Sequence, residues 1–157
     1  MSKHENCHHH ECNHEDCDCC QCVKEKQVVL AKEGAKPAGP YSPGMRVGNL
    51  LFVSGQLGID PQTGDLVAGG IEPETRQVIS NLRAVLEGAG IGLDQVVKTT
   101  VFLSDIREFG VFNSIYGEFF RENPPARSTF QVAAMPRGAS VQIEAVALIP
   151  CNCDCCE

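Results

Sequence analysis

The sequence predicts an α+β fold in which two helices pack on one face of a single mixed sheet. Three observations predict it: apolar residues at helical spacing over 73–87, a continuous run rich in β-branched residues at 96–103, and a period-two alternation of apolar and polar residues over 139–149. The expected elements follow one another in the order ββ(β)αβαββ, which is typical of an α+β arrangement.

The distribution of cysteine divides the chain into three parts, residues 1–22, 23–150 and 151–157. Six of the ten cysteines and all five histidines lie in the first part, four cysteines lie in the last, and the middle part has none. The middle part is long enough for one compact domain and needs no disulfide. We therefore expect one domain over residues 23–150, between a flexible Cys/His-rich tail and a short Cys-rich tail.

Charge and hydropathy exclude two classes of partner. The net charge is −7, but residues 23–150 hold 12 Lys/Arg and 13 Asp/Glu, so the acidity lies in the tails. The basic residues are scattered singly and form no stripe that could neutralise a phosphate backbone. No apolar run approaches the roughly 18 residues of a membrane span, and the N-terminal segment does not resemble a secretory signal. We expect a soluble, cytoplasmic protein that binds neither nucleic acid nor membrane.

The first elements are short strands. Residues 27–31 are expected to form a strand, and the stretch 34–44, rich in Gly and Pro, is expected to form a loop. Two brief apolar runs, 45–47 and 50–54, are separated by Gly48-Asn49, a tight turn signal, and so predict a β-hairpin.

The first helix is expected to run from Pro73 to Glu87, after a turn at residues 60–64. Proline suits the first helical position, and Gly88 and Gly90 end the helix. Its apolar stripe consists of Val78, Ile79, Leu82, Val85 and Leu86. The run at 96–103 that follows is continuous enough to be a buried central strand.

The second helix is expected to be capped by Asp105, with Glu108 three residues on, and to be stopped by Asn123-Pro124-Pro125. One face of this helix should carry Phe109, Phe112, Tyr116, Phe119 and Phe120.

The last two strands are expected at 127–134 and 139–149. Alternation in the final strand puts its residues on two faces, Val141, Ile143, Ala145 and Ala147 on one and Gln142, Glu144, Val146 and Leu148 on the other. Apolar residues on a sheet that is covered on one face only favour burial of the other face by oligomerisation.

Six strings, in identity and in order, resemble the RidA family, also called YjgF. The resemblance covers residues 28–150 and excludes the tails. The strings are Gly-Pro-Tyr-Ser at 39–42, Ser-Gly-Gln at 54–56, Pro-Gln-Thr-Gly at 61–64, Val-Val-Lys-Thr-Thr-Val-Phe-Leu at 96–103, Pro-Ala-Arg-Ser at 125–128 and Ile-Glu-Ala-Val-Ala at 143–147.

The resemblance implies a chorismate-mutase-like α+β fold assembled as a homotrimer, with sites in clefts between subunits. It implies hydrolysis of 2-aminoacrylate-type enamines and their imine tautomers to 2-keto acids and ammonium, an activity of the 2-iminobutanoate/2-iminopropanoate deaminase type. The substrate would be a small imine or enamine that carries a carboxylate. No metal or organic cofactor is expected for that chemistry.

Arg127 matches the carboxylate-binding arginine of the family. A guanidinium holds a planar carboxylate through two parallel hydrogen bonds, and the alternative is an ordinary surface or interface salt bridge. Tyr41 matches a residue that closes the cleft, against ordinary loop packing. Gly55 would let the substrate approach the backbone closely, or it is simply a turn glycine.

Two further residues are expected to bind substrate. Asn113 lies in the aromatic stripe of the second helix, and its counterpart in the family points at the cleft. Thr129 stands where the family often has cysteine, so a thiol is absent here, although its backbone amide can still donate to the substrate.

The final strand departs from the family pattern. The family usually reads Glu-Ile-Glu where this chain reads Gln142-Ile143-Glu144, and the first glutamate is the one credited with positioning the hydrolytic water. Glutamine hydrogen-bonds a water but does not take its proton. Glu144 shares a strand face with Gln142, roughly 7 Å along, and is the candidate to replace it. The chemistry is undemanding, because such imines hydrolyse in water unaided and need only orientation.

The tails carry candidate metal ligands. The tetrapeptide Cys-Asp-Cys-Cys occurs at 17–20 and again at 153–156, and thiolates at this density suit Zn²⁺ or Cu⁺. The alternatives are weak binding by a disordered segment and redox chemistry, which a cytoplasmic setting disfavours. The candidate ligands are Cys17, Cys19, Cys20, Cys22, Cys153, Cys155 and Cys156.

Three rival functions remain beside the deaminase. The chain could be a non-catalytic small-molecule binder or regulator that has lost turnover through Gln142, or a scaffold whose tails buffer metal. Some family members have carried labels such as translation inhibitor or endoribonuclease, but the near-neutral domain and its lack of histidine disfavour that reading. The same lack, together with the absence of cysteine from residues 23–150, excludes a Ser-His or Cys-His nucleophile there.

Overall fold

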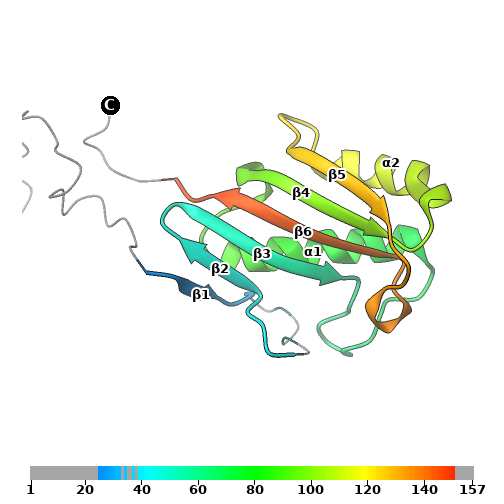
Figure 1. Cartoon of the computed structure of the whole chain (residues 1–157), viewed down its shortest axis with the longest axis horizontal. Helices are drawn as coiled ribbons and strands as arrows, with labels where there is room; N and C mark the ends of the chain where they lie inside the picture. Colours follow the sequence, from blue (N-terminus) through cyan, green and yellow to red (C-terminus); the bar gives the residue numbers. More distant parts are fainter. Residues whose placement is uncertain (1–24, 33, 35–36, 38, 151–157) are drawn as a thin grey trace, which may run out of the picture.

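One six-stranded sheet forms the frame of the molecule (Figure 1). The computed structural model describes residues 25–32, 34, 37 and 39–150, and the strand order among them is β1-β2-β3-β6-β4-β5. Neighbouring strands are antiparallel except β4 and β5, which are parallel. The strands are β1 (Gln27–Val29), β2 (Gly44–Val47), β3 (Leu50–Leu57), β4 (Val96–Leu103), β5 (Ala126–Gln131) and β6 (Val141–Leu148).

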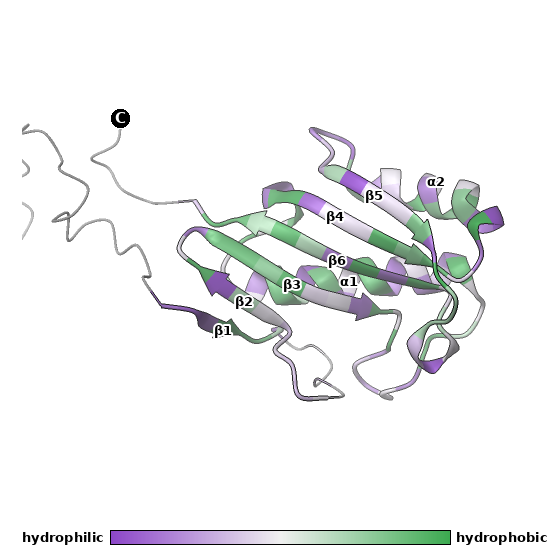
Figure 2. Ribbon diagram, viewed as in Figure 1, coloured by the Kyte–Doolittle hydropathy of each residue, from purple (hydrophilic) through white to green (hydrophobic). Residues whose placement is uncertain are grey.

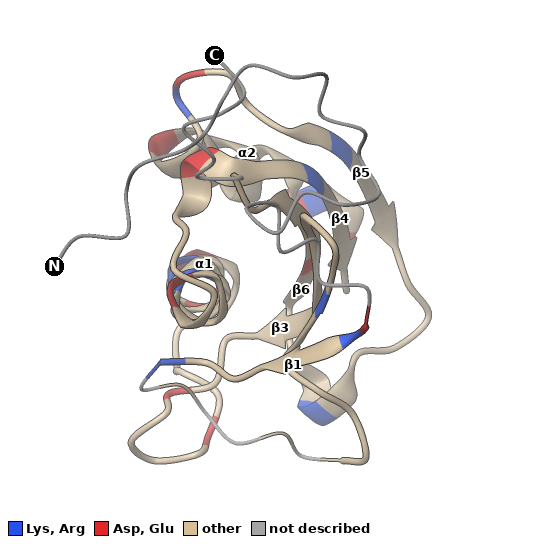
Figure 3. Cartoon of the chain, turned by 90° about the vertical axis from the view of Figure 1, so that its left-hand side faces the viewer, with Lys and Arg blue, Asp and Glu red and all other residues tan. Residues whose placement is uncertain are grey.

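Two helices, α1 (Ile71–Gly88) and α2 (Phe109–Phe119), cover one face of this sheet (Figure 3). Helix α1 packs against β3 and β6, and α2 packs beside α1. Three short 3₁₀ turns complete the described chain: η1 (Leu93–Gln95), η2 (Ile106–Glu108) and η3 (Pro136–Gly138). The predicted α+β arrangement with both helices on one face is confirmed.

Helix α1 begins two residues before the predicted start. Pro73 is therefore its third residue, which is tolerated because the first four N–H groups of a helix have no acceptor within it. The predicted apolar stripe is confirmed, since all five of its residues are fully buried. Glu74 also points inward, and its carboxylate accepts hydrogen bonds from the backbone N–H and hydroxyl of Ser140 at 2.7 and 2.8 Å.

The prediction that Asp105 caps the second helix is wrong, because Asp105 caps the short turn before that helix. The Asp105 carboxylate accepts a hydrogen bond from the Arg107 backbone N–H at 2.9 Å, so it caps the 3₁₀ turn η2, and α2 starts afterwards at Phe109. The aromatic stripe is confirmed for Phe112, Tyr116 and Phe120, which are buried. Phe109 is 37% exposed, because the first turn of α2 extends past the core.

The ends of β3 and β5 differ from the prediction because pairing with a neighbouring strand sets where each of them ends. Strand β3 continues past Ser54 to Leu57, since β6 runs beside it and pairs beyond a register shift between Val53 and Gln56. Strand β5 ends at Gln131 rather than 134, because its partner β4 ends at Leu103, opposite Gln131.

The core lies between the helices and the sheet. Alternation in β6 is confirmed: Val141, Ile143, Ala145 and Ala147 are buried, whereas Gln142, Glu144, Val146 and Leu148 are partly or fully exposed. In the described part of the chain, neither helix has the length and apolarity to cross a bilayer.

The sheet face opposite the helices carries exposed apolar side chains. The hydropathy colours of Figure 2 show hydrophobic residues along β3 and β6. Phe52 is 46% exposed and Phe130 is 54% exposed, and Leu50 and Leu148 lie open beside each other on neighbouring strands. Exposed apolar side chains gathered on one sheet face are typical of an interface.

Candidate functional site

A cavity of about 370 Å³ lies at the end of β3. The cavity lies at the register shift between Val53 and Gln56, where a bulge bends the strand and interrupts its pairing with β6. Its walls include three of the predicted site residues, Tyr41, Gly55 and Gln142.

The bulge brings Gly55 and Gln142 into contact. A Cβ atom on residue 55 would lie 2.4 Å from Nε2 and 2.8 Å from Cδ of Gln142, so the missing side chain makes room for the carboxamide. Within the described residues the Gln142 carboxamide has no hydrogen-bond partner. It is therefore available to a water or a ligand in the cavity.

Two hydrogen-bonded supports shape the cavity. Ser54 Oγ donates to the Ser42 carbonyl at 2.7 Å and ties the loop that carries Tyr41 to β3. On the far side, Asn81 of α1 donates to the carbonyls of Leu57 and Ile59, both at 2.8 Å. The loop and the end of β3 are thus held in place by Ser54, which lies in one of the strings that resemble the family, and by Asn81, which sequence reasoning did not single out.

Arg137 also lines this cavity and was not predicted. Its backbone φ is 59°, the left-handed region that residues with a side chain rarely adopt. Its guanidinium donates to the Gly64 carbonyl at 2.6 Å and lies 3.3 Å from the Asp65 carboxylate. Arg137 therefore ties the turn before β6 to the loop after β3, with its charge already matched.

Arg127 lies elsewhere, on β5 against α2. Its Nη2 atom donates to Asn113 Oδ1 at 2.6 Å. The guanidinium carbon lies 4.6 Å from the centre of the Tyr116 ring and 5.6 Å from the centres of the Phe109 and Phe112 rings. Such distances are those of cation–π contacts. Three aromatic rings and one amide thus hold the guanidinium in one place.

No carboxylate pairs with Arg127 within the described residues. Arg76, Arg107 and Arg137 each have an acidic partner, the first two in Glu118 and Asp105. A guanidinium has five N–H donors, so most of those of Arg127 remain open to an anion.

Tyr116 connects this arginine to the core. Its hydroxyl and Thr99 Oγ1 are 2.8 Å apart, and both side chains are buried. Burial raises the pKa of Tyr116 above its ordinary value, opposed by the Thr99 hydrogen bond and by the positive charge of Arg127. The ring therefore stays neutral beneath the guanidinium.

Thr129 follows Arg127 on the same face of β5. Its hydroxyl oxygen is buried and has no hydrogen-bond partner within the described residues, and a buried polar atom of this kind is uncommon in a folded protein.

Glu144 does not reach the cavity of Gln142. It shares the open sheet face with Gln142, as predicted, but it lines a separate groove of about 150 Å³ with Phe52, Lys98 and Thr100.

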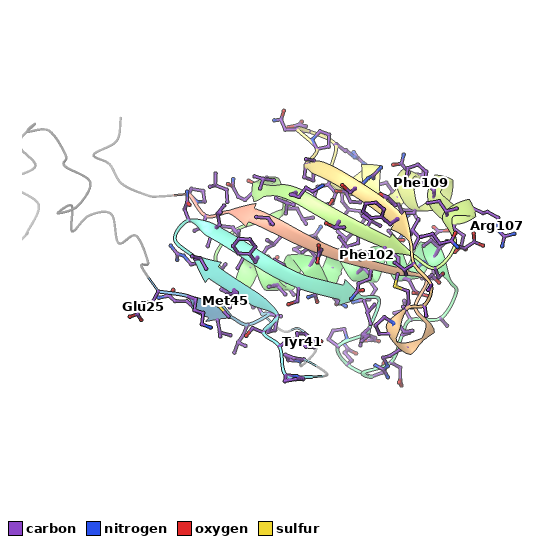
Figure 4. The ribbon with its side chains drawn as sticks, in the orientation of Figure 1. Glu25, Tyr41, Met45, Phe102, Arg107 and Phe109 are labelled. Atoms are coloured by element: carbon purple, nitrogen blue, oxygen red, sulfur yellow. The ribbon has the colours of Figure 1, made fainter. Side chains whose placement is uncertain are left out.

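The predicted site residues therefore form two groups on one chain. Gln142 is on β6, two strands from the β5 strand of Arg127, which is a distance of roughly 10 Å across the sheet. Along the strands, Arg127 is level with Thr99 of β4 and Ala145 of β6. Ala145 is three residues from Gln142, which is a distance of roughly 10 Å along β6. The Gln142 side chain lies on the open face, whereas that of Arg127 packs against α2. Tyr41 of the first group and Phe109 beside Arg127 lie well apart in Figure 4.

The part of the domain that the structure describes holds no cluster of metal ligands. Across residues 25–32, 34, 37 and 39–150, no three His, Cys, Asp or Glu side chains gather as a metal site would require. The predicted ligands lie outside the described residues: Cys17, Cys19, Cys20, Cys22, Cys153, Cys155 and Cys156.

Comparison with known proteins agrees with this fold. The family model for endoribonuclease L-PSP matches residues 32–149. A RutC family protein of Pyrococcus horikoshii is 44% identical over 122 residues, covering 78% of this chain and 97% of that protein. The 2-iminobutanoate/2-iminopropanoate deaminase of Mus musculus is 43% identical over 123 residues, which is 78% of this chain and 91% of the mouse protein.

A crystal structure of a putative endoribonuclease from Thermotoga maritima has the same fold. It is 45% identical to this chain and superposes with a TM-score of 0.76, covering 79% of this chain and 98% of the Thermotoga protein. The match to the family model, residues 32–149, leaves out both cysteine-rich ends, in agreement with the extent of the predicted resemblance.

Proposed function

This chain belongs to the endoribonuclease L-PSP family, the family of the RidA/YjgF proteins, and from that premise we propose that it hydrolyses small 2-imino acids, with their enamine tautomers, to 2-keto acids and ammonium. The relatives named as deaminases support this activity. The observation that carries it is the Arg127 guanidinium, which is held by Asn113 and Tyr116 and has no acidic partner within the described residues.

Arg127 binds the substrate carboxylate. The aromatic rings beneath the guanidinium fix its plane, and the bond to Asn113 fixes its rotation about the last side-chain bond. A pre-oriented guanidinium loses little entropy when it takes a planar carboxylate through two parallel hydrogen bonds. The imine carbon of the bound substrate is then held at a fixed place relative to the protein.

Gln142 orients the hydrolytic water. Its carboxamide accepts one hydrogen bond from the water and so directs a lone pair at the imine carbon. Water adds to the carbon–nitrogen double bond, the nitrogen takes up protons, and the resulting carbinolamine loses ammonia, which leaves the keto acid. The carboxamide takes no proton from the water in this scheme, so its contribution is orientation alone.

A complete site needs two copies of the chain. A small imino acid does not span the two groups of residues, which lie on different faces of the sheet and roughly 14 Å apart by strand spacing. We propose that the Arg127 group of one copy meets the Gln142 group of another, in a homotrimer whose interfaces cover the exposed Phe52 and Phe130.

A non-catalytic binder is the second candidate. The replacement of the family's glutamate by Gln142 favours it, because glutamine supplies no base. Nuclease activity has less support, since residues 23–150 contain no histidine and nearly equal numbers of acidic and basic residues.

The test is keto-acid release from 2-aminoacrylate, generated in situ by a serine dehydratase. Wild type is compared with Arg127→Ala, Gln142→Glu and the control Arg76→Ala, an arginine whose guanidinium already donates to Glu118 at 2.7 Å. We expect wild type and Arg76→Ala to accelerate release equally. Arg127→Ala should lose roughly 100-fold or more in kcat/KM, because two charge-assisted hydrogen bonds of roughly 1.5–3 kcal/mol each disappear.

The outcomes separate the candidates. An inert wild type with an active Gln142→Glu variant makes this chain a binder on a deaminase fold. If Arg127→Ala is as active as wild type, the assignment of the carboxylate site is wrong. Cleavage of an RNA substrate by the same preparation, retained in Arg127→Ala, would support the nuclease instead.

A further inference from the structure

Arg137 is the one charged side chain in the wall of the cavity beside Gln142, among the residues that the structure describes. The other polar side chains of this described wall are hydroxyls and carboxamides, and no Asp or Glu belongs to it. The turn η3, which carries Arg137, lies beside the end of β3 (Figure 1). An anionic group that enters the cavity therefore meets a positive charge and no negative one.

The Arg137 guanidinium keeps N–H donors for such a group. A guanidinium has five of them, and here Nη1 donates to the Gly64 carbonyl at 2.6 Å and Nη2 to the Asp65 carboxylate at 3.3 Å. The Asp65 side chain is 77% exposed, and an ion pair with so exposed a partner is weak because water competes for both groups. The other N–H groups of Arg137 have no acceptor within the described residues.

The backbone of Arg137 is strained at a place where glycine would not be. Its φ is 59°, a value that glycine adopts without steric cost and that an arginine adopts only where the surrounding structure fixes it. Residues strained in this way are frequent at ligand sites. The hydrogen bonds to Gly64 and Asp65 hold the guanidinium at the cavity wall.

The cavity is larger than the imine of alanine requires. Its volume is about 370 Å³, within the range of roughly 300–1,000 Å³ for pockets that hold drug-sized ligands. In the proposed site, Arg127 of another copy holds the α-carboxylate and the imine carbon lies at Gln142. The rest of the cavity is then left to the side chain of the substrate, whose far end can contact Arg137.

We propose that Arg137 selects substrates with a second carboxylate, so that this chain hydrolyses dicarboxylic 2-imino acids such as the imines of aspartate and glutamate. This inference rests on the proposed function and adds the substrate class. The free N–H groups of Arg137 donate to the distal carboxylate. A distal methyl group would cover the guanidinium without pairing it, and a penalty of this kind rejects the apolar analogue. The reaction is unchanged: water adds to the carbon–nitrogen double bond, and ammonia leaves a 2-keto dicarboxylic acid.

The first experiment compares two imines that differ only at the far end, those of glutamate and norvaline, in which a methyl group replaces the distal carboxylate. An amino-acid oxidase generates each imine in situ, and keto-acid release by the full-length chain is measured. The readout is the ratio of kcat/KM for the glutamate imine to kcat/KM for the norvaline imine. We expect a ratio of roughly 10 or more for wild type.

Three variants and one control test the role of Arg137. Arg137→Gln should lower the ratio roughly 10-fold or more, and Arg137→Lys should retain part of it. Asp65→Asn removes the internal competitor and should raise the ratio roughly twofold. The control is Arg121→Gln, because Arg121 lies outside the cavity and donates to the Glu118 carbonyl at 3.1 Å; it should keep the wild-type ratio. A purely structural role of Arg137 would change both kcat/KM values by one factor and leave the ratio unchanged.

The second experiment measures binding without turnover, by calorimetric titration with the two corresponding keto acids, 2-oxoglutarate and 2-oxopentanoate. Wild type should bind 2-oxoglutarate at least about fivefold more tightly, and Arg137→Gln should lose this preference.

The outcomes separate this proposal from the proposed function. If the alanine imine is hydrolysed but the wild-type ratio is 1 or less, or if Arg137→Gln keeps the wild-type ratio, the substrate class is wrong and the deaminase stands. If no imine is hydrolysed, the proposed function fails and the titration decides: equal affinity for the two keto acids overturns the role of Arg137, whereas a preference lost in Arg137→Gln supports it.

Discussion

Replacing Asn113 by aspartate should place a carboxylate beside Arg127 that competes with the substrate carboxylate for the guanidinium. Asn113 Oδ1 lies 2.6 Å from Arg127 Nη2, so an aspartate in the same rotamer places a full negative charge against the guanidinium. The new carboxylate satisfies the donor that the substrate carboxylate needs. Carboxylate ligands should therefore bind the variant more weakly.

The size of the effect follows from the exposure of this pair. Asn113 is exposed and Arg127 is partly exposed, and ion pairs at such sites contribute roughly 0.2–1 kcal/mol, far below the Coulomb energy of a buried pair. Taking the upper end, the internal pair adds about 1 kcal/mol that a ligand must overcome. This corresponds to a roughly fivefold rise in Kd.

The assay is calorimetric titration with 2-oxobutanoate, a stable carboxylate that resembles the product of the proposed reaction. Asn113→Ala removes the hydrogen bond that fixes the rotation of the guanidinium but adds no charge, so it should raise the Kd about twofold, less than the Asp variant does. The difference between the Asp and Ala variants should shrink at high salt. Wild-type affinity in Asn113→Asp would refute the reasoning. An equal loss in both variants would also refute it, because the amide bond and not the charge would then be decisive.

Three further predictions concern the cavity, the fold and pH. Gly55→Ala should displace the Gln142 carboxamide and lower the turnover of 2-aminoacrylate roughly 10- to 100-fold with little change in stability, as steady-state kinetics and urea unfolding would measure. Glu74→Ala removes the acceptor of both Ser140 hydrogen bonds and should lower the free energy of unfolding by about 2–3 kcal/mol in the same urea assay; unchanged stability would contradict that role. Burial raises the pKa of Tyr116 above 10.0. The contribution of Tyr116 to the stability of the fold is therefore fully present below pH 10.0 and is lost as the pH rises through the raised pKa. Phenolate absorbance in a variant lacking the other tyrosine should therefore increase only above pH 10, together with unfolding.

Local sequence patterns were sufficient to predict that most of the helices and strands exist and which type each one is. Strand β4 was predicted at its observed bounds, 96–103, and the alternation in β6 identified which residues are buried. The errors arose where a segment distant in the sequence, or a turn next to a helix, sets the boundary of an element. The end of β5 depends on where β4 ends, and the cap at Asp105 depends on a 3₁₀ turn that periodicity does not separate from the helix behind it.

The site was predicted by resemblance more than by pattern. No spacing in the sequence indicates that Tyr116 packs against Arg127, because this contact depends on how α2 lies against β5. The contact of Gly55 with Gln142 depends on a bulge in β3 that has no local signature. Arg137, whose backbone is left-handed, was missed because its contacts with Gly64 and Asp65 join two loops that lie far apart in the sequence.

Gln27, Arg46, Leu51 and Ala147 pair in one row across β1, β2, β3 and β6, and this placement has an evolutionary consequence. The chain enters and leaves at one end of β3 and β6, whereas the cavity at Gly55 and Gln142 lies at the other end of the same strands, roughly five residues or 17 Å away. Segments fused at either terminus therefore start at a distance from the cavity. A lineage could gain, lose or exchange such extensions while selection on the ligand cavity continued undisturbed, and a designer could attach a reporter or an anchor at the same place.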